Sequence, residues 1–268
     1  GDHNIINNAL LVLAHKKVNK LNINGGLRLE HSEKIGLQLI PQINLSLPRK
    51  NIVYRASAGR SIRQADFTES FNFYLRKNKH GGFSIGNPDL EAESAYTFDL
   101  GADAYISPKL KITNTVFALS SSNLIDYALT NSTEITNLIN LQDSTDYLYA
   151  SNIQESFTFG NEFGLNYKTE WPTVTIDWLL NYTYIQTNTP SNVVSKYIAN
   201  HPIHNINGGA TVLFNRFVWN ISGTLITRNA EDIPSIDGQV QNAYALMHTK
   251  LSYASPTAGI KLFVSARN

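Results

Sequence analysis

A strict alternation of apolar and polar residues over long segments limits the possible folds of this chain more than any other feature. In Thr173–Thr187, apolar and aromatic residues occupy the even positions from Val174 to Tyr184, and polar residues such as Asp177 and Asn181 occupy most odd positions. Successive side chains of a β-strand point to opposite faces, whereas a helix would scatter these residues around a cylinder. The pattern predicts strands whose two faces meet different environments.

The same alternation recurs along the whole chain and predicts about twelve strands. Most are roughly 9 to 13 residues long, whereas strands of globular proteins usually have about 5 to 6. A strand that crosses a bilayer needs about 9 to 11 residues. The predicted strands are Asn8–Lys16, Leu21–Glu30, Leu37–Leu47, Ile52–Arg60, Tyr96–Ile106, Leu110–Leu119, Phe157–Tyr167, Thr173–Thr187, Ile206–Phe214, Phe217–Arg228, Ala245–Tyr253 and Ile260–Ala266.

The connections between these strands alternate between tight turns and longer links, which is typical of outer-membrane barrels. The tight turns are Lys17–Lys20, Pro48–Asn51, Ser107–Lys109, Lys168–Pro172, Asn215–Arg216 and Ala254–Thr257. The links on the other side are His31–Lys34, Ser61–Ser94, Ser121–Glu155, Asn188–Pro202 and Asn229–Gln241. A soluble sandwich has no reason to produce this regular sequence of connections.

Aromatic residues gather near the predicted strand ends, for example Tyr167 and Trp171 near a tight turn and Tyr96 and Tyr184 near long links. Amphipathic rings favour the two membrane–water interfaces. Because hydrocarbon offers no partners to backbone polar groups, an antiparallel sheet can cross a bilayer only within a closed barrel. The sequence therefore predicts an all-β fold, an antiparallel transmembrane β-barrel segment of about twelve up-and-down strands, with residues 1–268 as one domain.

Composition excludes several other classes of protein. Charged residues make up 16% of the chain, below the ~25% of ordinary soluble domains. The 22 basic and 21 acidic residues nearly cancel, so we expect no nucleic-acid partner. The absence of cysteine excludes thiol catalysis and cysteine-based zinc sites. The residues Gly1–Asn8 lack the basic and apolar pattern of a signal peptide, so either the mature chain starts there or the sequence is an excerpt.

Several motifs in fixed order carry a resemblance to a known family. Tyr54–Glu69 form an arginine-bearing strand and a loop entrance, Gly86–Glu93 contain Gly-Asn-Pro-Asp-Leu, and Phe98–Gly101 belong to the next strand. Downstream, Phe159–Phe163 contain Gly-Asn-Glu, and Ile198–Pro202 precede a further strand. The set resembles the C-terminal half of the barrel of TonB-dependent outer-membrane receptors, with alignable features from about Leu10 to Asn268. The loop entrance departs from the family pattern, since Ile62–Ala65 lack the usual Phe and Pro.

This resemblance implies a fragment of a receptor in the outer membrane of a Gram-negative bacterium. Family members have about 22 strands, an N-terminal plug domain and a TonB-binding segment, and the plug, this segment and the closing strands are not visible in the sequence. The implied function is TonB-dependent uptake of a scarce nutrient such as an iron-siderophore, haem, cobalamin or an oligosaccharide. The implied partners are outer-membrane lipid, the plug domain of the same full-length chain, TonB and the small nutrient ligand. No cofactor is implied.

The candidate ligand-binding residues lie in the loops and on the polar strand faces. Those of the longest well-marked loop are Arg63, Phe67, Arg76, Lys77, Lys79 and His80. In haem-uptake members of the resembled family, a histidine between the two loop motifs contributes to ligand capture, and a neutral imidazole can ligate iron. Basic loop residues are equally common on any solvated surface.

Two acidic residues share the polar face of one strand. Asp99 and Asp103 are four residues apart, so their Cα atoms lie about 13 Å from each other, beyond the ~5 to 9.5 Å of glycosidase carboxylate pairs. We expect them to line the lumen and to meet Arg55, Glu162 or a plug surface. No motif for nucleophilic catalysis is present, and His201 and His204 have no third metal ligand nearby in sequence. We expect no catalytic residue and no metal site.

Two alternatives remain open at this stage. The first is a self-contained twelve-stranded barrel, either a passive porin or a membrane-embedded hydrolase in which the lumen-facing His248 would be essential. Twelve strands can close into a barrel, so their number does not exclude this alternative. The second is a soluble β-sheet adhesin or binding module, whose apolar strand faces would pack against a second sheet.

Overall fold

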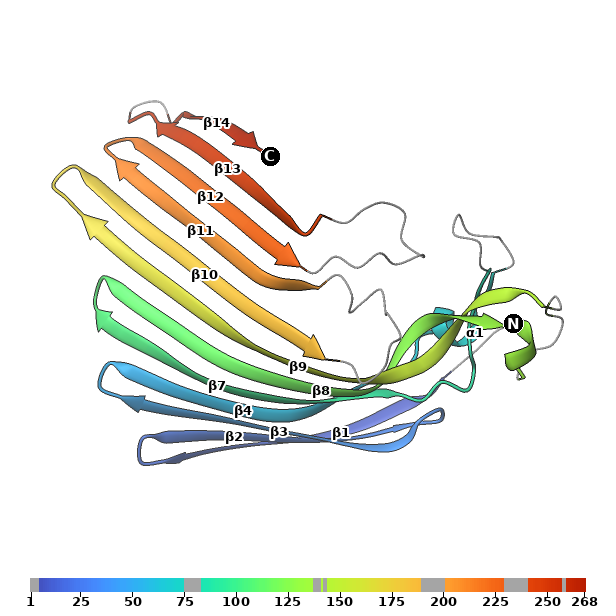
Figure 1. The fold of residues 1–268 in the computed structure, drawn as a ribbon. Coiled ribbons are helices and arrows are strands. Elements are labelled where there is room, and N and C mark those ends of the chain that lie inside the picture. The colour runs from blue at the N-terminus through green and yellow to red at the C-terminus, as the bar shows by residue number, and fades with distance from the viewer. Residues whose placement is uncertain are drawn as a thin grey trace.

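A computed structural model describes residues 5–74, 83–136, 141, 144–188, 201–228, 241–256 and 259–268. Its main feature is one sheet in which twelve long strands follow one another in chain order, each antiparallel to the next (Figure 1). These strands are β1 (Asn7–Val18), β2 (Leu21–Ser32), β3 (Gly36–Arg49), β4 (Ile52–Arg63), β7 (Glu93–Ser107), β8 (Leu110–Asn131), β9 (Asp146–Glu170), β10 (Val174–Asn188), β11 (Pro202–Phe214), β12 (Phe217–Arg228), β13 (Ala243–Ala254) and β14 (Lys261–Arg267). The predicted all-β fold is confirmed.

Short elements occupy the links at the loop end of the sheet. The link between β4 and β7 contains helix α1 (Phe67–Phe71) and strands β5 (Phe73–Tyr74) and β6 (Phe83–Ile85), and a 3-10 turn, η1 (Ser132–Glu134), follows β8. Strand β6 pairs in parallel with the start of β9. Figure 1 shows α1 at the end of the sheet opposite the tight turns. No described helix has the length and apolar character needed to span a membrane.

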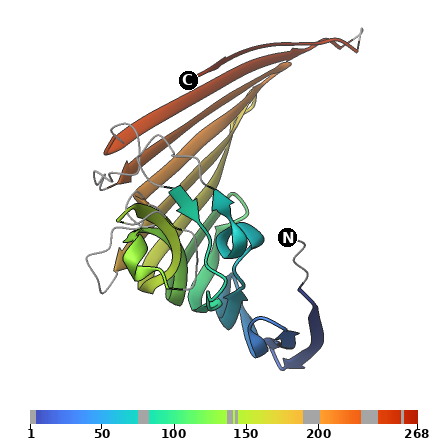
Figure 2. The same ribbon diagram turned by 90° about the vertical axis from the view of Figure 1, so that its right-hand side faces the viewer.

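The sheet bends across its strands into an open arc (Figure 2). In the described part of the chain, β1 pairs only with β2 and β14 only with β13, so the two edges do not meet. An open sheet edge is costly in lipid because its backbone groups lack partners. The arc therefore has the form of part of a larger barrel wall.

The strand register assigns every side chain of the sheet to one of two faces, because directly paired residues point to the same side. One row across the sheet is polar and contains Arg55, Gly101, Thr115, Glu162 and Thr183. The adjacent row is mostly apolar and contains Tyr54, Ala102, Asn114, Phe163 and Tyr182. We call the polar face the inner face and the apolar face the outer face.

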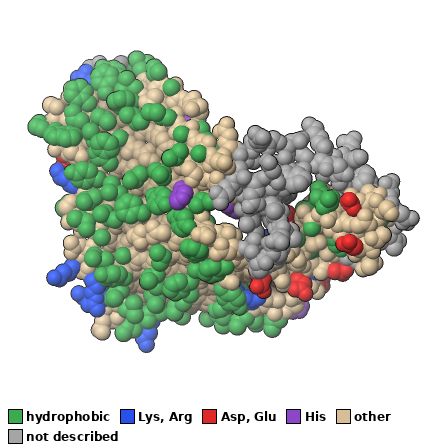
Figure 3. Space-filling model, in the orientation of Figure 1, with side chains coloured by type: hydrophobic (Ala, Val, Ile, Leu, Met, Phe, Trp, Pro, Cys, Tyr) green, Lys and Arg blue, Asp and Glu red, His purple; other side chains and the backbone are tan. Residues whose placement is uncertain are grey.

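The outer face carries large apolar side chains that no other layer of the described structure covers. Along β7, Tyr96, Phe98 and Leu100 are 60%, 51% and 50% exposed. Hydrophobic side chains spread over the strands in Figure 3. Such an extended apolar surface is unsuited to water. The soluble-module alternative required a second sheet against this face, and the described residues form a single sheet.

The buried hydrophobic residues lie beyond the arc, at the loop end. One cluster joins Ala65, Leu90, Ile125 and Ala150. A second cluster joins Ile85, Ile135 and Tyr147. These residues come from the β4–β7 link, from the loop-end parts of β8 and β9, and from the link between those two strands. This region therefore has a small core like that of a soluble protein. The rest of the sheet lacks such a core because its two faces are adapted to lipid and to the contents of the lumen.

The loop predicted over Ser121–Glu155 is wrong in its extent. Strand β8 continues to Asn131 and has 22 residues, and β9 begins at Asp146 and has 25. The register shifts between Ser121 and Ile125, and Asn123 has a φ of 57°. This bulge interrupts the alternation of apolar and polar residues. Beyond this bulge both faces of the β8–β9 hairpin are partly covered. The alternation of apolar and polar residues is therefore lost there, and the sequence does not predict a strand.

Five of the six tight turns were predicted correctly, and the sixth, Ala254–Thr257, lies partly outside the described residues. Three of the turns contain a residue in the left-handed region. Asn19, Lys50 and Asn215 have φ values of 54°, 48° and 52°. Asparagine tolerates this conformation better than most residues with a Cβ atom, whereas lysine does not share this preference. These turns fix the hairpin register of β1–β2, β3–β4 and β11–β12.

Candidate functional site

A cavity of about 620 Å³ lies on the inner face at the loop end of β4 and β7–β10. Phe117, Leu119 and Ile185 line it from the strands, and the side chains of Arg63 and Glu93 border it. We call it the mouth cavity. Its size and its mixture of apolar walls with a few charged groups are typical of small-molecule sites.

Arg63 forms the most extensive charged contact at this cavity. It is the last residue of β4 and is paired in register with Glu93, the first residue of β7. Its Nη2 lies 2.6 Å from Glu93 Oε1, and its Nη1 lies 2.9 Å from Glu69 Oε2. Planar guanidinium groups favour such two-point contacts with carboxylates. The sequence singled out Arg63 but neither glutamate, since the three residues are separated along the chain.

Glu69 also takes part in fixing the start of α1. Asp66 is the N-cap residue, and its side chain accepts a hydrogen bond from the Glu69 backbone N–H, at 2.7 Å. In return, Glu69 Oε2 accepts from the Asp66 backbone N–H, at 2.9 Å. This reciprocal arrangement is a capping box. The same glutamate thus caps the helix and joins it to Arg63.

The Gly-Asn-Pro-Asp-Leu motif lies against this helix. A Cβ atom on Gly86 would come within 2.7 Å of the backbone nitrogens of Phe71 and Asn72, so glycine permits the close approach. The Asn87 backbone N–H donates to the carbonyl oxygen of Glu69, at 2.8 Å. The Asn87 side chain in turn accepts from the backbone N–H of Asp89, at 2.9 Å. In this chain the motif therefore serves to pack the segment before β7 against α1.

Two asparagines fasten the start of β7 to the β8–β9 hairpin. Asn152 Oδ1 accepts from the Glu91 backbone N–H, at 2.9 Å, and Asn152 Nδ2 donates to the Asn123 carbonyl, at 2.8 Å. Asn123 Nδ2 donates to Glu91 Oε2, at 2.8 Å. The sequence analysis missed both asparagines, and the only local signal was the interruption of the alternation at Asn123.

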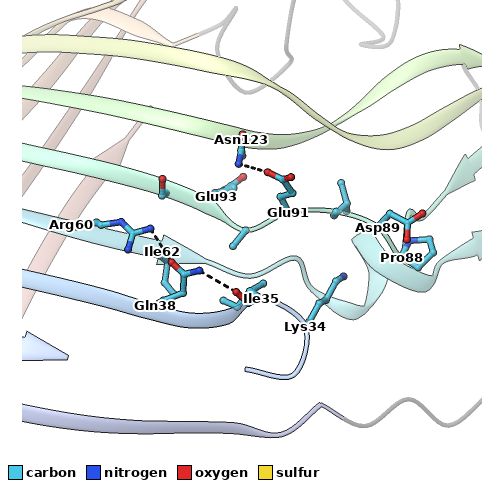
Figure 4. A pocket seen from close by; sticks show the side chains of 13 residues that line it. Lys34, Ile35, Gln38, Arg60, Ile62, Pro88, Asp89, Glu91, Glu93 and Asn123 are labelled. Carbon is cyan, nitrogen blue, oxygen red and sulfur yellow. Dashed lines mark hydrogen bonds between the residues drawn. The ribbon is translucent and has the colours of Figure 1, made fainter. Parts of the chain in front are cut away.

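A second, more polar pocket of about 530 Å³ lies between β3–β4 and the segment that leads into β7. In Figure 4, Lys34, Gln38 and Arg60 lie on one side and Glu91 and Asn123 on the other. Arg60 donates to the carbonyl of Leu39 and to Gln38 Oε1, at 2.7 and 3.0 Å. These two hydrogen bonds of Arg60 stabilise this side of the pocket.

Lys34 connects this pocket to helix α1. It lies in the turn between β2 and β3, and its Nζ donates to Ser70 Oγ, at 2.6 Å. Burial lowers the pKa of the Lys34 ammonium, while the negative charges of Asp89 and Glu69 act in the opposite direction. Lys34 was not among the predicted site residues, because nothing in the local sequence distinguishes it from other turn lysines.

The predicted acidic residues Asp99 and Asp103 lie on the inner face, below the mouth cavity. Asp103 pairs with Arg55 at 2.7 Å and with Lys111 at 3.6 Å. Asp99 accepts a hydrogen bond from Ser57 Oγ, at 2.6 Å. The expected contact with Arg55 is present. This part of the wall neutralises its own charges.

The remaining predicted residues are dispersed. Phe67 lies on α1, is 53% exposed, and has its ring centroid 6.2 Å from that of Phe71. The candidates Arg76, Lys77, Lys79 and His80 lie outside the described residues. Their relation to the mouth cavity therefore stays a prediction.

The two histidines that the sequence analysis did not assign to a metal site, His201 and His204, lie on different parts of the structure. His201 borders the mouth cavity. His204 lies on the outer face, where its Nδ1 is 2.9 Å from the hydroxyl of Tyr182. Across the described ranges, no three His, Cys, Asp or Glu side chains are grouped closely enough to hold a metal ion.

Together, the apolar outer face, the polar inner face and the alternating turns define the wall of an outer-membrane β-barrel. Comparison with known families identifies the type. The family model described as TonB dependent receptor-like, beta-barrel matches residues 5–268. The chain belongs to this family, and the predicted resemblance is confirmed.

Solved structures with a similar fold are siderophore receptors and an outer-membrane transporter. The siderophore receptor PirA from Pseudomonas aeruginosa has a TM-score of 0.73 and 16% identity over 98% of this chain. The transporter YddB from Escherichia coli has a TM-score of 0.74 and 10% identity over 98% of this chain. The ferric enterobactin receptor of Pseudomonas aeruginosa, in complex with enterobactin, has a TM-score of 0.71 and 16% identity over 97%. A search of curated proteins finds no match.

The chain spans less than half of these structures, namely 45% of PirA, 41% of YddB and 39% of the ferric enterobactin receptor. Family and fold together place it in the outer membrane of a Gram-negative bacterium. The family consists of receptors and transporters rather than enzymes, which weighs against the hydrolase alternative.

Proposed function

We propose that residues 1–268 form one part of the barrel domain of a longer receptor for TonB-dependent uptake of a scarce nutrient. The mouth cavity is the observation that carries this proposal. It opens on the inner face at the loop end, where a ligand from outside would arrive first, and it combines apolar walls with the charged border of Arg63, Glu69 and Glu93. Among the nutrients considered, a ferric siderophore is favoured, because similar folds include siderophore receptors.

In this proposal the loops capture the ligand and the strands form the pathway. Arg63 and Phe67 hold or border the loop entrance, and Arg76, Lys77, Lys79 and His80 contribute to ligand capture from the same link. Asp99 and Asp103 line the lumen below. The chain lines a pore and has no catalytic role. Its outer face contacts membrane lipid, its inner face surrounds the plug domain of the full-length receptor, and TonB acts on that receptor from the periplasm.

Narrowing the mouth cavity in the full-length receptor tests the function. Leu119→Trp places a large ring into the cavity lining. Its matched control is Leu129→Trp on the same strand, which replaces a leucine that is 66% exposed. Uptake of iron-labelled ferric enterobactin is measured in iron-limited cells with and without TonB, beside binding to the purified proteins.

We expect TonB-dependent uptake by the unmodified receptor and by the control, and at least a tenfold loss with Leu119→Trp at equal surface expression. A receptor that takes up the probe equally well without TonB would contradict the active-transport mechanism. Equal uptake by the two tryptophan variants would contradict the assignment of the mouth cavity.

A further inference from the structure

The two ends of the sheet carry opposite charges. In Figure 3, arginine and lysine side chains gather mainly at the end with the tight turns, and aspartate and glutamate side chains gather at the loop end. Every tight turn except Ala254–Thr257 contains a lysine or an arginine, and Glu170 is the only acidic residue in these turns. In the described parts of the links Ser61–Ser94 and Ser121–Glu155, the only basic residue is Arg63. The tight-turn end is therefore the positive end of this wall.

Three exposed cations at the tight turns have no counter-ion. Arg49 and Lys50 belong to the β3–β4 turn, and Arg216 belongs to the β11–β12 turn. Within the described part of the chain, no ion pair joins any of them to an acidic side chain. Each of the two hairpins has a described strand on either side, so neither lies at an open edge of the sheet. We call Arg49, Lys50 and Arg216 the basic rim.

The basic rim borders the apolar outer face. Arg49 lies on this face two residues beyond Leu47, or about 7 Å along the strand. The partner of Leu47 in register is Tyr54, which is 47% exposed on the same face. Arg216 directly precedes Phe217, whose outer-face ring is 41% exposed. The cations therefore lie where the apolar band of the wall ends.

Aromatic residues mark the same level of the wall. All three tryptophans of the chain, Trp171, Trp178 and Trp219, lie in or close to tight turns and are 44–55% exposed. The indole N–H of Trp178 donates to Thr169 Oγ1, at 3.2 Å, and that of Trp219 donates to Thr249 Oγ1, at 2.8 Å. Tryptophan favours the membrane–water interface because its ring is apolar and its N–H is polar. The basic rim is thus at the depth of the lipid headgroups.

We propose that the basic rim binds the phosphates of anionic phospholipids in the periplasmic leaflet of the outer membrane. The short turns of outer-membrane barrels face the periplasm. Cations at a membrane surface attract anionic headgroups, and a guanidinium can contact two phosphate oxygens at once. In a zwitterionic headgroup an ammonium offsets the phosphate, so a rim with net positive charge favours lipids with net negative charge. This inference goes beyond the proposed function and does not depend on the nutrient or on TonB.

The spacing of the two turns indicates more than one bound lipid. Strands β7, β8, β9 and β10 lie between β4 and β11 in the sheet. At about 4.8 Å between neighbouring strands, the β3–β4 turn and the β11–β12 turn are separated by roughly 24 Å along the sheet. A single headgroup cannot contact Arg49 and Arg216 together. Each turn therefore binds its own lipid, and the preference for negative charge extends along the wall.

The lipid preference of the full-length receptor tests this proposal. The purified receptor is placed in nanodiscs of equal parts phosphatidylethanolamine and phosphatidylglycerol, and the lipids that stay bound after transfer to detergent are counted by native mass spectrometry. We expect at least a fivefold excess of phosphatidylglycerol on the unmodified receptor. The number of bound phosphatidylglycerol molecules should fall at least twofold in Arg49→Glu/Arg216→Glu.

The matched control is Arg49→Lys/Arg216→Lys, which keeps both positive charges and should retain most of the bound phosphatidylglycerol. All receptors are compared as folded barrels, identified by their heat-dependent gel mobility. Equal numbers of the two lipids on the unmodified receptor would overturn the proposal. The same conclusion would follow if the glutamate variant bound as much phosphatidylglycerol as the lysine variant.

A second measurement uses the unmodified receptor and so does not depend on the folding of a variant. Phosphatidylglycerol with a photoreactive headgroup is present in both leaflets of the vesicles, so both ends of the barrel meet it, and the labelled peptides are mapped by mass spectrometry. We expect at least threefold more labelling at residues 48–51 and 215–217 than at the loop-end links, and less labelling in 1 M salt, where charges are screened within about 3 Å. Labelling that is concentrated at the loop end, or that salt does not change, would contradict the proposal. Neither measurement involves uptake, so a failure of the proposed function would not alter the result.

Discussion

Arg63 donates hydrogen bonds to both carboxylate oxygens of Glu93, from Nε to Oε2 and from Nη2 to Oε1, each at 2.6 Å. Its remaining Nη1 contacts both oxygens of Glu69, at 3.0 and 2.9 Å. One side chain thus joins the end of β4, the start of β7 and the first turn of α1. The geometry depends on a planar group with several fixed donors, which only arginine provides.

Replacement of Arg63 by lysine should loosen the link between β4 and β7. A lysine ammonium lacks the planar arrangement of donors that binds both oxygens of Glu93 and reaches Glu69 at the same time. Because Arg63 is partly exposed, we expect a local loss of roughly 1 kcal/mol, or about fivefold in the open population. Limited proteolysis of the full-length receptor, followed at residues 64–92, measures this change. Arg28→Lys is the control, since its partner Glu30 lies on the same strand. Equal cleavage of the two variants would show that the Arg63 contacts do not restrain the link.

Gly160 is a second position where the structure makes a sharp prediction. It faces the lumen on β9, and a Cβ atom there would overlap the ring of Phe117 and the carbonyl oxygen of Tyr184. Gly160→Ala should therefore cost about 1 to 3 kcal/mol, as overpacking usually does, and should displace a ring that lines the mouth cavity. The control is Gly25→Ala, where a Cβ atom would meet no atom within 4 Å. Urea unfolding of both variants in liposomes measures the difference, and equal midpoints would contradict the packing described for Phe117.

The assignment of the two faces can be tested on a single strand. Leu100 lies on the outer face of β7 and Thr97 on the inner face. Leu100→Lys should destabilise the barrel folded into liposomes by roughly 2 to 4 kcal/mol if the residue lies near the bilayer midplane. Thr97→Lys should change the stability by less than about 1 kcal/mol. Folding is followed by the heat-dependent shift in gel mobility. A larger effect at Thr97 would show that the inner and outer faces are assigned the wrong way round.

The turn between β3 and β4 contains a residue that is poorly suited to its backbone. Lys50 has a φ of 48°, in the left-handed region. Lys50→Asn should stabilise the hairpin by roughly 0.5 to 1 kcal/mol, because asparagine adopts this conformation at lower cost. Lys20→Asn, in the β1–β2 turn, is the control, since Lys20 does not share this conformation. Refolding yield in detergent at rising urea concentration measures the effect, and a loss of stability in Lys50→Asn would contradict the conformation assigned to this turn.

The alternation of side chains was sufficient to predict the fold of most of the sheet, because a strand between lipid and lumen shows its two environments in its sequence. It failed beyond Ser121, where the bulge at Asn123 and the contacts of the upper hairpin remove the difference between the faces. The site was predicted less completely. Arg63 was found through a motif, but its partners Glu69 and Glu93 lie 6 and 30 residues further along the chain. Only the folded structure brings them together.

The long hairpin of β8 and β9 has a consequence for how the cell surface is encountered. Strand β8 has 22 residues, about twice the roughly 9 to 11 that a bilayer crossing requires. The additional residues, about twelve, extend it by about 40 Å at ~3.3 Å each. Antibodies, phages or neighbouring cells that approach from the medium would therefore meet the outer parts of β8 and β9 before they reached the membrane surface.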